Sequence, residues 1–427
     1  MLSSSTIPNN VTVLGSGYAS EIVEGAHAWL TMSNNTMINN IHIDDAAGTC
    51  TANGDFALDV LNPSDATVEN SWILNAGCFG IFVQQNIAGT SGAVNITGNF
   101  LTGEGNNDVI GGGATPYLGQ HLVQVNISGN NIIQNNSVNT GDNNAIDIVA
   151  QNNTNITNNI LQGQIILGGE QVPTLHATVT GNTIQPAIGT NYGGIQLSQN
   201  TTSSAATSSY INVTNNNITL GQIYLQSNGP ENATTSEIIV ANNNISGSVS
   251  TSSAHNDGII ASGMQYGSIT GNNIVGASTS LYLSGTDSLV ISNNVFASYN
   301  TAVAFNGTNT NNQFMNNIGY VVPTQWTAVT SFSNSWVNYG SGFSNASYYK
   351  DLAGVVHIKG FVHGGTVGTA IFTLPAADCP PDEEVFAVSN NDLYGEVRIT
   401  TGGVVEQQSI TGANNSWLSL DGISFPN

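Results

Sequence analysis

The sequence predicts an all-β protein in which a solenoid of parallel strands is followed by an antiparallel β domain. Three observations support this prediction. A short Asn-rich motif recurs along the chain, strand-like alternation lies between its copies, and no stretch has the periodicity of a helix. The expected organisation is a lead-in over residues 1–20, a solenoid over residues 21–322 and a C-terminal domain over residues 323–427.

The recurring motif is a β-branched residue, Thr or Ser, Gly or Asn, a further Asn, and then another apolar residue. Aligned copies place the marker position at residues 40, 71, 99, 130, 159, 182, 216, 243, 272, 294 and 317, at intervals of 22–34 residues that average 27.7. Asn and Gly tolerate the left-handed backbone of tight corners, and stacked Asn side chains can form amide ladders. The repeat therefore predicts about eleven coils.

A second pattern, a small residue followed by Ile-x-Leu, lies between the copies of the first. Gly194-Ile195-Gln196-Leu197 and Gln222-Ile223-Tyr224-Leu225 are examples. Every second residue of such a strand points inward, and repeated short strands without helices predict parallel strands that pair between successive coils. The outward positions form a predicted column: Asp59, Phe82, Asp147, Ile166, Gln196, Tyr224, Ile260, Tyr282 and Ala304.

The charge of the chain excludes several functions. The formal net charge is −23, and residues 1–349 contain 17 Asp and Glu but no Lys or Arg. Binding to nucleic acids or to anionic lipid needs cationic side chains, so no nucleic-acid partner is expected. No 18-residue apolar run occurs, so no membrane insertion is expected either.

The three cysteines do not form a disulfide framework or a metal motif. Reduced, buried thiols are the expectation. The 28-residue spacing of Cys50 and Cys78 fits equivalent places on adjacent coils, where a stacked thiol column is expected and a disulfide stays open as the alternative.

The repeated motif resembles the right-handed parallel β-helix family, which includes pectin-degrading enzymes and phage tailspikes. The resemblance covers roughly residues 20–320. It implies a rod of about eleven coils, roughly 50 Å long. Polysaccharide lyases of this family use an Arg or Lys base with calcium-bound uronate, and because the rod has no Lys or Arg, lyase chemistry is not expected.

The last hundred residues carry a second resemblance. The segments Tyr348–Asp351, Gly354–Gly360 and Ser416–Phe425, with Thr373-Leu374-Pro375 and Pro380-Pro381 between them, are similar to the C-terminal β-sandwich of phage tail fibres and tailspikes. This resemblance implies a cap that helps a homotrimer form and contacts the host surface. Within it, His357, His363 and Lys359 are the candidates for receptor contact, with ordinary strand side chains as the alternative.

Hydrolysis of a polysaccharide would need two carboxyl groups at a defined separation. Asp147 is the central candidate, and Asp108 or Glu104 from the preceding coil is its preferred partner. Glu170, one coil after Asp147, is the other choice. For each of these acids a solvated structural carboxylate is the alternative.

Sugar binding without cleavage needs only aromatic faces flanked by amides and hydroxyls. Tyr224 and Tyr282 are expected on one face two coils apart, with Gln196 and Gln226 nearby, and stacking for rigidity is the alternative. Asp44-Asp45, or Asp142 with Asp147, could group oxygens around calcium, but no calcium motif occurs. No metal and no other cofactor are therefore predicted.

These features favour a trimeric phage tailspike or tail fibre that binds a bacterial surface polysaccharide, such as lipopolysaccharide or capsule, and possible hydrolysis of that polysaccharide is left open. Its expected place is the virion tail, where it would contact tail or baseplate proteins. Two alternatives remain. One is a structural fibre whose receptor contacts lie in the cap, and the other is a secreted β-helix glycoside hydrolase.

Overall fold

The described residues between 4 and 320 form three long parallel sheets, and two antiparallel sheets follow. The computed structural model describes residues 4–25, 28–45, 56–62, 65–85, 91–103, 108–114, 122–134, 144–148, 152–168, 175–188, 193–199, 209–227, 235–247, 257–297, 300–320, 326–350, 354–408 and 415–427. The chain divides into two compact units, Met1–Val321 and Val322–Asn427. Among the described residues no helix is long and apolar enough to span a membrane.

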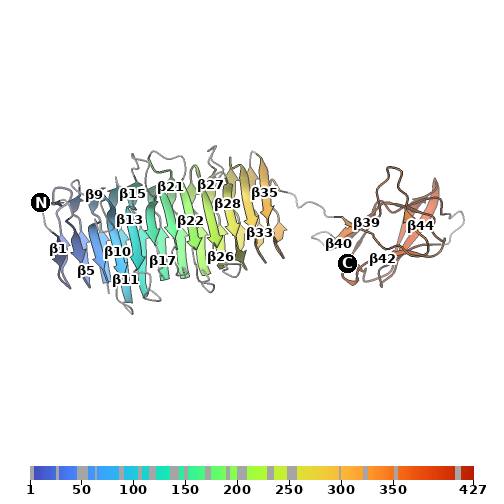
Figure 1. Cartoon of the computed structure of the whole chain (residues 1–427), viewed down its shortest axis with the longest axis horizontal. Coiled ribbons are helices and arrows are strands. Elements are labelled where there is room, and N and C mark those ends of the chain that lie inside the picture. Colours follow the sequence, from blue (N-terminus) through green and yellow to red (C-terminus); the bar gives the residue numbers. More distant parts are fainter. Residues whose placement is uncertain are drawn as a thin grey trace. The chain divides into compact units, whose positions relative to one another are not determined.

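The first unit is a parallel β-helix (Figure 1), because consecutive strands enter the three sheets in turn and each strand pairs with the strand one coil away. Sheet 1 contains, in spatial order, β1 (Ser5–Ile7), β4 (Leu30–Met32), β7 (Phe56–Leu61), β10 (Phe79–Gln85), β13 (Ile110–Ala114), β16 (Asn144–Ile148), β19 (Gln164–Leu167), β22 (Gly193–Gln199), β25 (Gly221–Ser227), β28 (Asp257–Ser262), β32 (Thr279–Ser284) and β35 (Thr301–Asn306).

Sheet 2 contains β2 (Thr12–Leu14), β5 (Thr36–Asn39), β8 (Asp65–Glu69), β11 (Ser91–Thr97), β14 (Leu122–Ser128), β17 (Asn152–Thr157), β20 (Leu175–Thr180), β23 (Ser209–Thr214), β26 (Thr235–Ala241), β30 (Ser268–Thr270), β33 (Val290–Ser292) and β36 (Gln313–Met315), and β29 (Met264–Gln265) also pairs with β26. Sheet 3 contains β3 (Glu21–Val23), β6 (His42–Asp44), β9 (Trp72–Ala76), β12 (Phe100–Gly103), β15 (Asn131–Gln134), β18 (Ile160–Gln162), β21 (Thr183–Gln185), β24 (Asn217–Ile218), β27 (Asn244–Ser246), β31 (Asn273–Val275) and β34 (Val295–Ala297).

The predicted β-helix is confirmed, and its described strands make one coil more than the eleven repeats. Residues 1–20, expected as a lead-in, contribute β1 and β2, which pair with β4 and β5 of the next coil. The repeat missed this coil because Thr12-Val13-Leu14-Gly15 carries no Asn. The register is otherwise as the repeat implied, with Ile or Val stacked on Ile or Val through one continuous core.

The corner between sheets 2 and 3 has two specialised positions. The first adopts φ between 50° and 69° in eleven coils, at Asn40, Asn70, Gly98, Gly129, Asn158, Gly181, Asn215, Asn242, Gly271, Asn293 and Asn316. The next residue is Asn in nine of these coils, Asn99 to Asn317. From Asn99 to Asn294 its side chain donates to the Asn oxygen of the following coil and to a backbone carbonyl. Ser71 joins the ladder through its backbone N–H, which donates to Asn99. The predicted amide ladder is therefore present.

The second unit consists of two antiparallel sheets around one core that includes Trp336, Phe372 and Phe425. The smaller sheet contains β37 (Thr327–Ala328), β39 (Ser347–Lys350), β40 (Val355–Lys359) and β47 (Ile423–Pro426). The larger contains β38 (Val337–Asn338), β41 (Phe361–His363), β46 (Leu418–Ser419), β43 (Glu384–Asn390), β44 (Leu393–Ile399), β45 (Val404–Gln407) and β42 (Ala370–Thr373), and a short 3-10 helix η1 (Ala376–Asp378) follows β42 in sequence.

One apolar run of this unit is divided between the two sheets. The run Val355–Val362 breaks at Gly360, which has φ +115°, and a Cβ there would lie 2.5 Å from the Cα of Ala346. Only glycine fits this close approach, so the chain changes sheet at this residue.

Candidate functional site

A groove of about 520 Å³ lies on the outer face of sheet 2, over four successive strands from β14 to β23. Strand spacing makes these strands span roughly 14 Å along the stack. The lining side chains are amides, a hydroxyl and two aromatic rings, and none of them is a carboxylate: Gln124, Asn153, Asn155, His176, Thr178, Tyr210 and Asn212.

The floor of the groove is a column of outward residues in register. Asn155 pairs with Thr178, and Thr178 with Asn212, on adjacent strands. Asn155 also donates to the Oδ1 of Asn126 at 2.9 Å, so the amide column continues beyond the groove. The floor therefore offers hydrogen-bond donors and acceptors at the regular spacing of the coils.

An aromatic wall stands beside this floor. The rings of His176 and Tyr210 stack with their centroids 4.8 Å apart and their planes at 4°. Tyr210 is 51% exposed. Its hydroxyl donates a hydrogen bond to Glu237, and this bond, followed by the negative charge of Glu237, raises the pKa of Tyr210.

The wall belongs to a column of residues with left-handed backbone. Seven successive coils have one residue each with φ between 50° and 59° at an equivalent position of sheet 2. Each of these residues directly follows a member of one row of paired residues, which runs across the strands from Asn152 to Thr310. We call these residues the left-handed column: Asn153, His176, Tyr210, Glu237, Tyr266, Ser288 and Asn311. Tyr and Glu rarely adopt this conformation, and strain of this kind is concentrated at functional sites.

The left-handed column was not predicted. The sequence does hold a signal, because each member lies three residues before the first apolar position of the repeated motif, as Tyr210 does before Val213 and Glu237 before Val240. Alignment of the repeats would have shown large side chains gathered at one position. It would not have shown their left-handed backbone conformation.

The predicted outward column of sheet 1 is confirmed by register. Gln196 pairs with Tyr224, and Tyr224 with Ile260, which in turn pairs with Tyr282. The Tyr224 hydroxyl donates to the Oε1 of Gln226, and burial raises the pKa of Tyr224. The two tyrosines are thus two coils apart on one face, and their role in glycan binding stays a prediction.

The structure partly describes the catalytic candidates. Glu104 and Glu170 lie outside the described residues. Asp108 is buried and accepts a hydrogen bond of 2.9 Å from Asn144, three residues before Asp147 on the adjacent strand. The Gly111–Asp147 pairing then implies a Cα separation of about 11 Å between Asp108 and Asp147. Their pairing as acid and base stays a prediction.

The outward column of sheet 1 contains one residue that was not predicted, Gly111, which lies between Phe82 and Asp147. At the column's start Asp59 is 5% exposed, and burial raises its pKa to about 6. Asp59 lies three coils from Asp147, as predicted, and does not share a site with it.

The cap candidates are engaged in contacts within their own unit. His357 stacks on Tyr349 with the centroids 4.6 Å apart, and His363 packs edge-on against Tyr339. The Nζ of Lys359 lies 4.2 Å from the ring centroid of Trp326. These contacts give each side chain a structural role, and receptor contact stays a prediction.

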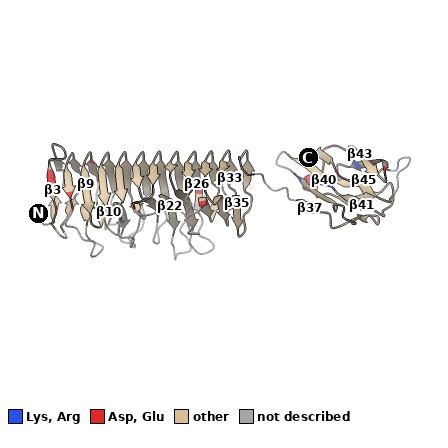
Figure 2. Ribbon diagram, turned by 90° about the horizontal axis from the view of Figure 1, so that it is seen from above, with Lys and Arg blue, Asp and Glu red and all other residues tan. Residues whose placement is uncertain are grey.

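The other two basic side chains of the unit also have intramolecular partners. Lys350 donates to the carbonyl oxygen of Ala377. Arg398 pairs with Glu406 and Glu383. Figure 2 shows that Lys and Arg occur in this unit alone.

Cys78 is buried and disulfide-bonded, so the expectation of a reduced thiol at this position is wrong. Cys50, its expected neighbour, lies outside the described residues. Cys379 is a free cysteine, as predicted, but it is only partly buried.

No protein-family model and no curated protein matches the sequence. Among solved structures, the chain is similar to the tailspike of E. coli bacteriophage HK620 in complex with a pentasaccharide, at 12% identity over 98% of this chain and 86% of that one, with a TM-score of 0.41. It is also similar to the receptor-binding domain of the Siphovirus 9NA tailspike, at 12% identity, 90% and 74% coverage and a TM-score of 0.39. A third is the Dettilon tailspike, at 13% identity, 92% and 86% coverage and a TM-score of 0.35. By its own sheet topology the chain is a parallel β-helix protein with an antiparallel C-terminal unit, and it has a distant structural likeness to phage tailspikes.

Proposed function

We propose that this chain is the receptor-binding part of a phage tailspike or tail fibre, and that the groove on sheet 2 binds a neutral or amino-sugar polysaccharide of the bacterial surface. The observation that carries the proposal is the groove itself. A polar floor of Asn155, Thr178 and Asn212 lies beside an aromatic wall of His176 and Tyr210.

The chemistry of the groove suits sugars better than other polymers. Pyranose rings present apolar faces and hydroxyl edges, which match an aromatic wall and a floor of amides. The absence of Lys and Arg from residues 1–349 disfavours nucleic acids and acidic glycans, because nothing in that part of the chain would neutralise their charge. The repeat of equivalent positions along sheet 2 also suits a polymer with a repeating unit.

The test is binding to an array of bacterial lipopolysaccharides and capsular polysaccharides. Tyr210→Ala should weaken binding to the recognised glycan at least tenfold, because it removes half of the aromatic wall. Tyr394→Ala is the matched control, since Tyr394 is also exposed and also hydrogen-bonds a neighbouring Glu, Glu396, but lies in the cap. Unchanged binding by Tyr210→Ala would refute the groove as the binding site.

The same array tests the alternative in which receptor contacts lie in the cap. Lys359→Ala and His363→Ala should bind the glycan as the wild type does if the groove is responsible. Loss of binding in these variants, with Tyr210→Ala unaffected, would instead support a structural rod with an adhesive cap.

Assembly as a homotrimer attached to tail or baseplate proteins is part of the proposal. Its supports are the repeat and the C-terminal segments that resemble phage fibres. Light scattering on the whole chain should give three chains per particle, and a monomer at micromolar concentration would contradict this part of the proposal.

Cleavage of the bound glycan is a second candidate activity, favoured by two acids of adjacent coils, Asp108 just before β13 and Asp147 on β16. If the chain shortens a recognised polysaccharide, Asp147→Asn should abolish shortening without abolishing binding. Shortening that persists in Asp147→Asn would exclude this assignment.

A further inference from the structure

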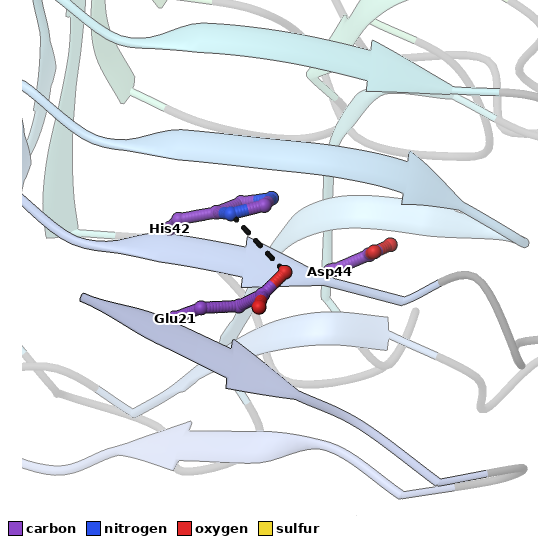
Figure 3. A group of neighbouring side chains, drawn as sticks. All are labelled: Glu21, His42 and Asp44. Atoms are coloured by element: carbon purple, nitrogen blue, oxygen red, sulfur yellow. Dashed lines mark ion pairs between the residues drawn. The ribbon is translucent and has the colours of Figure 1, made fainter. Parts of the chain in front are cut away.

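Two carboxylates and one imidazole lie close together on sheet 3, in the first two coils. Glu21 on β3 pairs in register with His42 on β6, and Asp44 follows on the same face of β6. One possible ligand atom from each lies within 4.8 Å of those of the other two. Figure 3 shows the Glu21 carboxylate turned toward the His42 ring, with Asp44 beyond it.

His42 is the unusual member of this group. Its side chain is 4% exposed, and neither ring nitrogen makes a hydrogen bond. The Nδ1 atom lies 3.4 Å from the Oε1 of Glu21, which is an ion-pair distance. Buried polar atoms are nearly always hydrogen-bonded, so an imidazole in this state calls for a further partner.

The surroundings hold the imidazole in one orientation. Tyr18 stacks on the His42 ring with the centroids 4.3 Å apart and the planes at 16°, and Trp72 packs edge-on against Tyr18. Asn75 donates a hydrogen bond of 3.0 Å to the Oδ1 of Asp44. Neighbours that orient the ligating side chains are a regular feature of protein metal sites.

We propose that Glu21, His42 and Asp44 bind a divalent transition-metal ion, with Zn²⁺ as the best fit. An imidazole nitrogen with two carboxylate oxygens is a ligand set that Zn²⁺ accepts, and water can complete the coordination. Two ligands about 2.1 Å from a tetrahedral ion lie about 3.4 Å apart, which is the distance between His42 and Glu21. Asp44 needs to move by no more than about 1.5 Å to complete the arrangement.

The ion would join the first two coils, since Glu21 belongs to one and His42 and Asp44 to the next. Its role is therefore structural. Binding to the folded state alone stabilises that state, so Zn²⁺ should raise the melting temperature. This site lies on a different sheet from the groove, and its existence does not depend on glycan binding.

The test is calorimetric titration of ZnCl₂ into the untagged, metal-free chain. The expected result is one ion per chain with micromolar or tighter affinity, and His42→Ala should weaken binding at least tenfold. Glu21→Gln and Asp44→Asn keep side-chain volume and should weaken binding as well, which keeps the test decisive if His42→Ala does not fold. Cys379→Ser, which removes a free thiol, and Asp382→Asn, which removes an exposed carboxylate in the cap, should bind as the wild type does.

Co²⁺ gives a second readout that does not rely on heat. The wild-type complex should show visible d–d absorption, and Glu21→Gln and His42→Ala should lose it. The proposal is overturned if no Zn²⁺ binding is detected when the Zn²⁺ concentration is 100 times that of the chain. It is also overturned if the wild type and all three site variants bind Zn²⁺ equally. Binding of Ca²⁺ in preference to Zn²⁺ would also overturn it.

Discussion

At the scale of single residues, the left-handed column and the corner between sheets 2 and 3 share a backbone conformation but differ in their side chains. The corner before sheet 3 has left-handed backbone in eleven coils and uses only Asn and Gly, which adopt it at little cost. The left-handed column has the same backbone conformation at His176, Tyr210, Glu237 and Tyr266. Because Asn or Gly would relieve the strain there, the larger side chains are explained by what they present to solvent.

Replacing Tyr210 should therefore separate stability from binding. In Tyr210→Asn the left-handed backbone is retained with less strain, so the melting temperature should rise by about 2 °C while glycan binding is lost. Differential scanning fluorimetry and the polysaccharide array give the two readouts. Tyr282→Asn, in an ordinary strand, should instead lower the melting temperature, and a fall for Tyr210→Asn as well would contradict the strain account.

Asp59 should make stability fall as pH rises. Burial raises its pKa to about 6 in the folded chain, against 3.8 for an ordinary Asp. The folded state then binds more protons than the unfolded state between about pH 4 and pH 6, so folding loses up to about 3 kcal/mol as pH rises through this window. Asp59→Asn should stabilise the chain at pH 8 and have little effect at pH 4, as measured by denaturant unfolding. An effect of equal size at both pH values would show that the carboxyl does not titrate as described.

At the scale of elements, the amide ladder fixes the corner between sheets 2 and 3. Asn182 accepts from both the backbone N–H and the side-chain Nδ2 of Asn159, and donates to the Oδ1 of Asn216 and the carbonyl oxygen of Ile156. The side chain therefore bonds buried groups of the two neighbouring coils. Such a ladder couples neighbouring coils without any ion pair.

Asn182→Ala should destabilise the β-helix by about 2–4 kcal/mol, because two buried donors of Asn159 lose their acceptor. Asn217→Ala is the control, since Asn217 belongs to an exposed amide column in which Asn244 donates to it. The control should cost less than about 1 kcal/mol. Equal losses in the free energy of unfolding would mean that burial of the ladder is not what matters.

How far the sequence predicts these elements depends on how local the cause is. The corners and the ladder were predicted because Asn and Gly act through their own backbone and their equivalent in the next coil. The outward column of sheet 1 was predicted because strand alternation is local too. The groove was not, because alternation places Tyr210 outward but indicates neither its left-handed backbone nor its stacking on His176.

The cluster of Glu21, His42 and Asp44 escaped prediction for a related reason. Glu21 belongs to a coil without the Asn motif, so its register with His42 could not be read from the repeat. In the cap, Lys359 was named as a candidate for receptor contact, and its contact with the ring of Trp326 could not be predicted from the sequence. Contacts between segments far apart in sequence are what the repeat could not supply.

At the scale of the whole molecule, the chain carries a large negative charge that ion pairs do not balance. Residues 1–349 have no Lys or Arg, so apolar columns and amide ladders hold the β-helix together. Salt screens repulsion between the acids and has few attractive pairs to weaken. Raising NaCl from 50 to 500 mM should therefore leave the melting temperature unchanged or slightly higher, and a clear fall would show that attractive charge pairs matter.

The central claim is that a bacterial surface polysaccharide binds across the strands of sheet 2. A crystal structure of the chain with an oligosaccharide from the recognised polysaccharide tests it most directly. The account predicts sugar density along Asn155, Thr178 and Asn212, with a ring packed against His176 and Tyr210. Sugar bound instead at Tyr224 and Tyr282 on sheet 1, or only in the cap at His357, His363 and Lys359, would contradict it.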